Sequence, residues 1–466
     1  MRQIKSKIEL LSQPEIEMIH SKTLDLLERV GLKVPNDEVL DICHGMGCIV
    51  DKNTKTLKIP TRLIEDVIRQ NKNKRDKEDF VPGKLYGDIS TQVFLVDLLK
   101  REKRYGLMDD ILKGIILVEK LDYIRAANSV VIPNDIPTEM AEVEAFKMIY
   151  TYSNKPGATY VLTPFSARYV LPMADVMGLK HTYLFETISP LTFRKETLEI
   201  GLIYAKHGHP LRCGPLPMAG ATAPVSIAGT VVLTNAEVLG SLFMIHALTH
   251  NLCPYGSPAH SIDMRTMLCS FGSPNQALLG IALSQMARFY GLTTLTNSGL
   301  SDAILPDFQS GFEKAASAIM AHMTGSNDIG CQGIVGADQG FSFEQLVIDN
   351  EWLSYYNYIL KGIEVTDESI GLDVIEKVGF GGNYMAEEHT VKYMHDSYWN
   401  SKLFKKDTWE QWIDHGQKDI LANAHDYVNN ILTDYKSVTP VIDKSKLDTL
   451  NDIAGQAWDE YKSSLK

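Results

Sequence analysis

Residues 211–256 have the sequence LRCGPLPMAGATAPVSIAGTVVLTNAEVLGSLFMIHALTHNLCPYG, and this stretch decides the fold. Two short apolar runs, at 211–216 and 252–256, flank a long apolar segment at 224–250. Short apolar runs predict strands buried on both faces, and the longer segment between them predicts a crossover helix. A strand–helix–strand unit of this kind indicates two parallel strands in one sheet.

The same alternation continues on both sides of this stretch. Further strands are predicted at residues 130–132, 158–163, 183–188, 293–296 and 329–335, and further helices at 139–153, 274–290, 308–324 and 343–362. The number of units favours a closed (β/α)8 barrel over an open doubly wound sheet, and no GxGxxG motif follows a strand. We therefore predict an α/β fold with a TIM-type barrel over residues 130–400.

The segments outside the predicted barrel have helical patterns. Helices are predicted at 13–30, 35–46, 61–71 and 110–127, with one strand at 92–96. Residues 1–129 are thus expected to form a helical elaboration packed on the barrel. Residues 401–466 are expected to form a C-terminal helical segment with a charged helix at 408–435.

The composition restricts the partners of the chain. The 466 residues carry a formal net charge of −12, which disfavours binding to nucleic acid or to an anionic membrane surface. The N-terminal twenty residues lack the apolar core and cleavage site of a signal peptide, and polar residues interrupt the longest apolar stretch, 219–248. Six scattered cysteines without a CxxC pair indicate reduced thiols. A cytoplasmic protein is expected.

No familiar catalytic motif is present: HExxH, GxSxG and a P-loop are all missing from the sequence. The loops that follow the predicted strands are rich in Gly, Pro, Ser and Asn, and such loops form the catalytic face of a (β/α)8 barrel. Cys213, Cys253 and Cys331 lie in or beside predicted strands. They are interpreted as small core residues, with a zinc site that also uses His260 as the alternative.

Two phenylalanines lie at the start of the predicted helix 308–324. Phe308 and Phe312 are four residues apart and share a face, which is typical of a core stripe but also of an aromatic wall around a cation. Asp307 directly precedes this helix, where a carboxylate caps the free backbone N–H groups. The spacing alone leaves both interpretations of the aromatic pair open.

Several blocks, in order along most of the chain, resemble the trimethylamine methyltransferase superfamily. They include PMAGATAP at 217–224, TNAEVL at 234–239, YGSP at 255–258, GFEK at 311–314, EQLVIDNE at 344–351 and GGNY at 381–384. Trimethylamine enzymes of this superfamily carry pyrrolysine in the barrel, whereas the corresponding region here, GIVGADQG at 333–340, contains only ordinary residues. The chain is therefore similar to the pyrrolysine-free branch.

This resemblance implies transfer of a methyl group from a quaternary amine to the Co(I) of a cognate corrinoid protein. Glycine betaine, proline betaine, carnitine and γ-butyrobetaine are the implied donors. A quaternary nitrogen leaves as a neutral amine, so the displacement needs no general acid or base, and the protein's task is to position the reactants. The corrinoid (cobalamin) is expected on the partner protein, and a homo-oligomer is expected. A non-catalytic binding protein for quaternary amines remains the other alternative.

The resemblance also raises particular residues as site candidates. An aromatic cage for the cation is assigned first to Phe308 and Phe312, then to Tyr255, Phe341, Tyr384 and Phe94.

Polar candidates accompany this cage. His260 and Gln332 are expected to bind a betaine carboxylate, and His389 and Asn383 are expected to face the corrinoid partner or the substrate.

Overall fold

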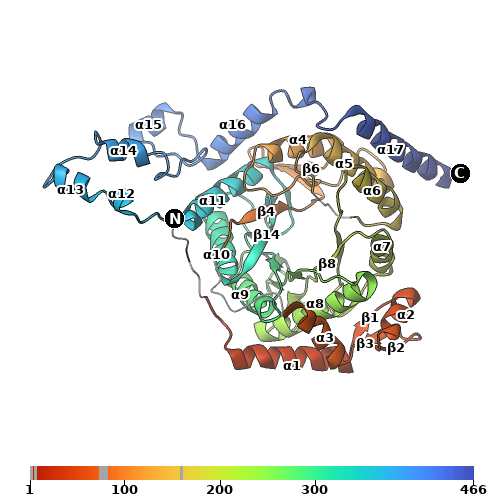
Figure 1. Ribbon diagram of the computed structural model, residues 1–466. Helices are drawn as coiled ribbons and strands as arrows, with labels where there is room; N and C mark the ends of the chain where they lie inside the picture. The colour runs from red at the N-terminus through yellow and green to blue at the C-terminus, as the bar shows by residue number, and fades with distance from the viewer. Residues whose placement is uncertain (1–3, 5–7, 73–81, 158–160, 466) are drawn as a thin grey trace.

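Eight helices surround a set of parallel strands in the computed structural model, which describes residues 4, 8–72, 82–157 and 161–465 (Figure 1). These helices are α4 (Met108–Glu119), α5 (Thr138–Tyr152), α6 (Pro164–Val176), α7 (Lys195–Lys206), α8 (Ile227–Thr249), α9 (Pro274–Phe289), α10 (Phe308–Thr324) and α11 (Phe343–Lys361). The predicted helices at 139–153, 224–250, 274–290, 308–324 and 343–362 are confirmed as α5, α8, α9, α10 and α11. No helix was predicted for α6 or α7.

The strands inside the ring of helices run parallel to their neighbours. One sheet has the order β10 (Tyr255–Gly256), β13 (Thr294–Thr296), β14 (Ser326–Gln332), β4 (Tyr86–Ile89), and β7 (Tyr183–Phe185) pairs with β8 (Leu211–Cys213). Parallel bridges from Gly87 to Ile124 and from Ala127 to Pro156 extend the order beyond β4. The parallel strands thus begin at Tyr86, earlier in the chain than the predicted barrel start at residue 130.

Strands β8 and β10 approach each other closely without forming a hydrogen-bonded ladder among the described residues. A Cβ atom added to Gly256 would lie 2.1 Å from the carbonyl oxygen of Cys213, so only glycine permits this approach. Part of the predicted strand 158–163 falls on residues 158–160, which lie outside the described residues. The structure therefore shows a mixed α/β fold with parallel sheets, as predicted at the level of class.

Helix α8 is apolar on all sides because it is covered on all sides. Its inner face contacts β8 and β10, and its outer face contacts α1 (Gln13–Arg29), α2 (Asp37–Gly45) and α3 (Thr61–Lys72). By length and hydropathy α8 resembles a membrane span, but 83% of its most apolar window is buried inside the molecule. Helix α8 is therefore a core helix of this fold.

The N-terminal helices are accompanied by a small antiparallel sheet of order β1 (Leu32–Lys33), β3 (Thr56–Lys58), β2 (Ile49–Asp51). Helix α1 ends at Arg29, and Gly31 follows with φ +80°, where a side chain would strike the carbonyl oxygen of Leu57. The predicted stop of the first helix at Gly31 is confirmed.

Two small sheets built from the loops lie beyond the parallel strands. One contains β15 (Ile334–Val335), β16 (Gly340–Phe341), β5 (Phe94–Asp97) and β6 (Glu102–Tyr105). The other contains β12 (Cys269–Ser270), β11 (His260–Ile262) and β9 (Met218–Ala219). Both follow the carboxyl ends of parallel strands, so they wall the face where α/β proteins bind ligands.

The C-terminal region has two parts. Helices α16 (Ile420–Leu432) and α17 (Lys444–Ser464) pack on the outside of the ring, against α11 and α4 and against α5 and α6. Helices α12 (Asp367–Ile370), α13 (Leu372–Val378), α14 (Glu388–Tyr393) and α15 (Trp409–Asp414) extend away from the ring in Figure 1 and bury none of their residues. The single helix predicted at 408–435 is wrong, because Gly416 with φ +86° separates α15 from α16. A short 3-10 helix, Tyr435–Ser437, follows α16.

Candidate active site

Charged side chains point into the ring of parallel strands. On β8, Leu211 and Cys213 belong to the apolar core, so the alternation of a strand directs Arg212 to the opposite, inner side. On β4, Gly87 and Ile89 are buried toward the helices while Asp88 is half-buried on the inner side. The interior of the ring is therefore polar at the middle of β4 and β8.

Asp88 and Arg212 influence each other electrostatically. Burial raises the pKa of Asp88, and the positive charges of Arg125 and Arg212 oppose that rise. Arg125 itself forms an ion pair with Asp328. Within the described part of the chain, neither Asp88 nor Arg212 has an ion-pair partner within 4.0 Å. Both charges are thus available to a ligand.

A chain of hydrogen bonds joins three residues from separate strand ends of this region: Cys331, Asn297 and His260. The Cys331 thiol donates to Asn297 Oδ1 at 3.4 Å, and Asn297 Nδ2 lies 2.9 Å from His260 Nε2. Burial lowers the pKa of His260 to about 4 and raises the pKa of Cys331 to about 12, so both are neutral near pH 7. Cys331 has φ 51° at an irregularity of β14, a left-handed conformation that is costly for a non-glycine residue.

Asp338 completes the site from the loop between β15 and β16. Its carboxylate accepts a hydrogen bond from Gln92 Nε2 at 3.1 Å. Asp338 is exposed to solvent; desolvation by the protein around it raises its pKa, and the hydrogen bond from Gln92 opposes the rise. We define the strand-end site as Asp88, Arg212, His260, Asn297, Cys331 and Asp338.

Of the buried candidates predicted from the sequence, only His260 belongs to this site. Tyr255 lies between β10 and α8, where its hydroxyl donates to Asn235 Oδ1 at 2.7 Å. Gln332 lies on the helix side of β14, beside Gly87 and Gly299, and Phe341 packs against Phe343. These three side chains are fully buried in packing positions, and their functional roles stay predictions.

The remaining candidates are distributed over the surface. Phe308 and Phe312 stack on each other with ring centroids 5.9 Å apart and are 85% and 64% exposed. Phe94 lies on β5 against Tyr105.

Three candidates lie in the extended region between α11 and α16. Tyr384 is exposed, Asn383 accepts a hydrogen bond from the backbone of Met385, and His389 bonds to the carbonyl of Glu368. The structure brings none of these three to the strand ends, and their roles also stay predictions.

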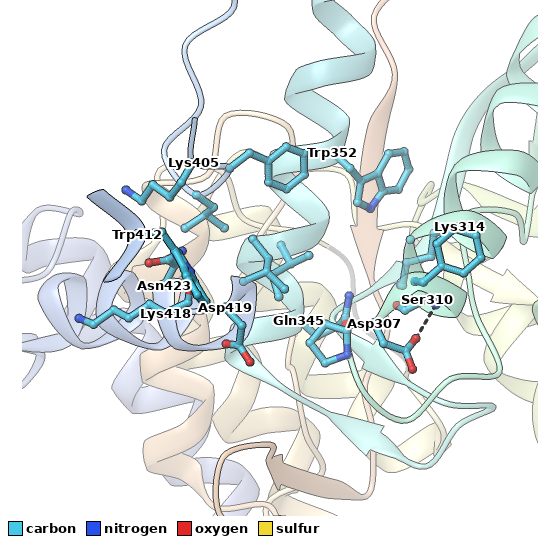
Figure 2. A pocket seen from close by; sticks show the side chains of 17 residues that line it. Asp307, Ser310, Lys314, Gln345, Trp352, Lys405, Trp412, Lys418, Asp419 and Asn423 are labelled. Carbon is cyan, nitrogen blue, oxygen red and sulfur yellow. Dashed lines mark hydrogen bonds between the residues drawn. The ribbon is translucent and has the colours of Figure 1, made fainter. Parts of the chain in front are cut away.

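Phe308 lines a separate cavity of about 580 Å³, which lies outside the ring between α10, α11 and α16 (Figure 2). Asp307 accepts a hydrogen bond from the backbone of Ser310 at 3.1 Å, which confirms the predicted helix cap. At the base, Lys314 bonds to the buried Asp349 at 3.2 Å. We call this space the outer aromatic cavity; its aromatic lining residues are Phe308, Trp352, Phe404 and Trp412.

The described residues do not provide a ligand set for the zinc site that the sequence left open as an alternative. Cys213 and Cys253 lie 3.7 Å apart, but Cys213 also donates to the carbonyl of Pro254, while Cys331 and His260 both bond to Asn297. Among the described residues no group of three His, Cys, Asp or Glu side chains is placed to hold a metal ion. None of the six cysteines forms a disulfide in the described structure, and their reduced state stays a prediction.

Four residues of the strand-end site were not predicted from the sequence: Asp88, Arg212, Asn297 and Asp338. One signal was present: Arg212 is a lone charge inside the apolar run 211–216, and a charge inside a buried strand needs a polar environment. Asn297 and Asp338 lie in loops already expected to form the catalytic face. Asp88 offered no signal because β4 was not predicted.

A polar site at the carboxyl ends of parallel strands is the arrangement of an α/β enzyme. The sequence model of the family "Trimethylamine methyltransferase (MTTB)" matches residues 1–457, and the chain belongs to this family of methyltransferases.

Relatives match along nearly their whole length. A trimethylamine methyltransferase of Desulfitobacterium hafniense is 30% identical over 97% of this chain and 94% of its own. A trimethylamine methyltransferase of Methanosarcina barkeri is 27% identical over 93% and 92%. A glycine betaine methyltransferase of Desulfitobacterium hafniense is 25% identical over 95% and 96%. The family resemblance seen in the sequence is confirmed.

Proposed function

We propose that this chain transfers a methyl group from a quaternary amine to the Co(I) of a separate corrinoid protein. We also propose that its parallel strands close into a (β/α)8 barrel, with the strand-end site at the catalytic face. Each of the helices α7 to α11 follows a parallel strand, and isolated parallel bridges at Ile124 and Pro156 lie between α4, α5 and α6, which supports a closed barrel. A cytoplasmic homo-oligomer that binds its corrinoid partner transiently completes the proposal.

The observation that carries the proposal is the pair of carboxylates at the strand ends. Asp88 is half-buried and Asp338 is exposed; desolvation by the surrounding protein raises the pKa of both, and within the described residues neither has an ion-pair partner. A permanent cation placed between them would relieve that cost by pairing with the ionised carboxylates. A quaternary ammonium is such a cation at every pH.

The other residues of the site suit a displacement at carbon. His260 and Cys331 are neutral and bonded through Asn297, so they form neither an activated nucleophile nor an acid–base pair near pH 7. The Co(I) of the partner supplies the nucleophile, and the amine leaves as a neutral base without proton transfer. The protein's own residues bind the donor, orient one methyl toward the open face and exclude water.

A spectroscopic assay tests this function. The purified chain is mixed with a Co(I) corrinoid protein and with glycine betaine, carnitine, choline or trimethylamine, and the appearance of methyl-Co(III) is followed. We expect methyl-Co(III) with at least one quaternary amine and none with trimethylamine. Activity with trimethylamine alone, or ligand binding without any methyl-Co(III), would contradict the proposal.

A further inference from the structure

We propose that Arg212 is a specificity-determining residue that restricts the site to methyl donors carrying a carboxylate. The inference rests on the proposed function and deepens it. Arg212 occupies the middle of β8, and the neighbours Leu211 and Cys213 face the helices. Its guanidinium therefore extends into the ring and acts electrostatically on Asp88 and on Cys331.

Other arginines beside the strands differ from Arg212 in being paired. Arg125 forms an ion pair with Asp328, Arg194 pairs with Glu186 at 3.2 Å, and Arg104 binds Asp110 through two bonds of 2.7 and 2.8 Å. Among the described residues, Arg212 has no carboxylate within 4.0 Å. A half-buried guanidinium on the inner side of the strands without an ion-pair partner is placed to bind a ligand anion.

Arg212 and Asp88 lie on opposite sides of the ring. Counted from β4 through β14, β13 and β10, the strand β8 that carries Arg212 is the fourth strand away from Asp88. Figure 1 shows β4 and β8 on facing sides of the ring. One ligand between them meets a negative group on one side and a positive group on the other.

A zwitterion matches this arrangement of charge. Its quaternary nitrogen pairs with Asp88 and its carboxylate accepts two parallel hydrogen bonds from the Arg212 guanidinium. A donor without a carboxylate leaves Arg212 unpaired and places a second positive charge beside it. The site should therefore accept glycine betaine or carnitine and discriminate against choline and tetramethylammonium, which have similar cationic heads.

Calorimetric titration of the full chain measures this preference without the corrinoid partner. We expect the wild type to bind glycine betaine or carnitine about 100-fold more tightly than choline, as expected for a buried charge pair. Arg212→Met should remove this preference by weakening betaine binding about 100-fold, with choline binding unchanged or stronger, and Arg212→Lys should restore part of it. Arg29→Met on the exposed face of α1 is the matched control and should change nothing.

Two results would overturn the inference: wild-type affinity for choline equal to that for both betaines, or an equal loss of both ligand types in Arg212→Met with a normal melting transition. If Arg212→Met fails to fold, the wild-type preference and Arg212→Lys still decide. The proposed function is tested separately. If the chain prefers donors with a carboxylate but forms no methyl-Co(III), methyl transfer is contradicted, whereas the role of Arg212 in ligand specificity is not.

Discussion

The strand-end site and the outer aromatic cavity differ in every property that matters for a methyl donor. The strand-end site is polar, draws its groups from β4, β8, β11, β14 and the loops after β13 and β15, and holds two carboxyl groups with raised pKa. The outer aromatic cavity lies between helices, is mainly apolar, and has a polar base already neutralised by the Lys314–Asp349 ion pair. An aromatic lining alone therefore does not identify the active site, because it also occurs where helices meet.

The ion pair at the base of the outer aromatic cavity should stabilise the fold. Its loss is expected to have the largest effect of the substitutions proposed here. Asp349 is fully buried and accepts bonds from Lys314, the backbone of Gly333, Gln345 and Trp352. Lys314→Met leaves this carboxylate without its cation and should lower the free energy of unfolding by about 3–5 kcal/mol, measured by urea denaturation.

Lys22→Met is the control, because the Lys22–Asp25 pair is exposed and such pairs contribute about 0–1 kcal/mol. Equal losses in the two variants would show that the buried pair has no special structural role.

A buried carboxyl group behind the strands should make stability depend on pH. Burial raises the pKa of Glu142 to about 7, so the folded chain holds this proton more tightly than the unfolded chain. The resulting stability is fully present below the ordinary glutamate pKa and is lost as the pH rises toward 7. Glu142→Gln should remove this decline and be about 1–3 kcal/mol more stable than the wild type at pH 8.

Thermal melts across that pH range measure the effect of Glu142. Glu139→Gln, on the exposed face of the same helix, should retain the wild-type decline. If the stability of Glu142→Gln declined with pH as that of the wild type does, Glu142 would not be the cause of the pH dependence.

Donor binding at the strand-end site should weaken as the pH falls. Asp88 and Asp338 pair with a cation only when ionised, and their raised pKa values shift protonation to higher pH than for an exposed aspartate. The dissociation constant of a quaternary amine should rise about tenfold on acidification through this range. In Asp338→Asn the dependence should become shallower. A constant affinity down to the ordinary aspartate pKa would exclude a role for either carboxylate.

The smallest expected effect is the change in donor affinity when the exposed phenylalanines are replaced. This change distinguishes donor binding at the strand-end site from donor binding at the aromatic pair. If the donor binds at the strand ends, Phe308→Ala and Phe312→Ala should change its affinity less than about twofold, because both rings lie exposed on α10 and are not part of the strand-end site. The cage predicted from the sequence requires instead a loss of about 0.5–2 kcal/mol for each ring. Calorimetry on both variants decides between these outcomes.

The comparison also explains what the sequence could predict. Long apolar segments such as 308–324 and 343–362 match α10 and α11 because helix periodicity and caps are local properties. Helix α6 was missed because Pro172 lies inside it, and proline disfavours a helix interior. Strand β4 was missed because Gly87 and Asp88 interrupt its apolar pattern.

The site was harder to predict than the fold. Tyr255 and Phe341 lie beside glycine-rich loops in sequence, but the alternation of short strands turns them toward the helices. His260, selected from the sequence as a ligand for a carboxylate, lies at the strand ends, and its role as a ligand stays a prediction. Asp88 and Arg212 are 124 positions apart in the sequence, and their electrostatic interaction arises only from the packing of β4 and β8 in the folded chain.

A crystal structure of the chain with a bound donor, such as glycine betaine, tests the central claim most directly. The account predicts the quaternary nitrogen at the carboxyl ends of the strands, beside Asp88, with the carboxylate on Arg212. Density for the donor in the outer aromatic cavity, against Phe308 and Trp412, with an empty strand-end site would contradict it.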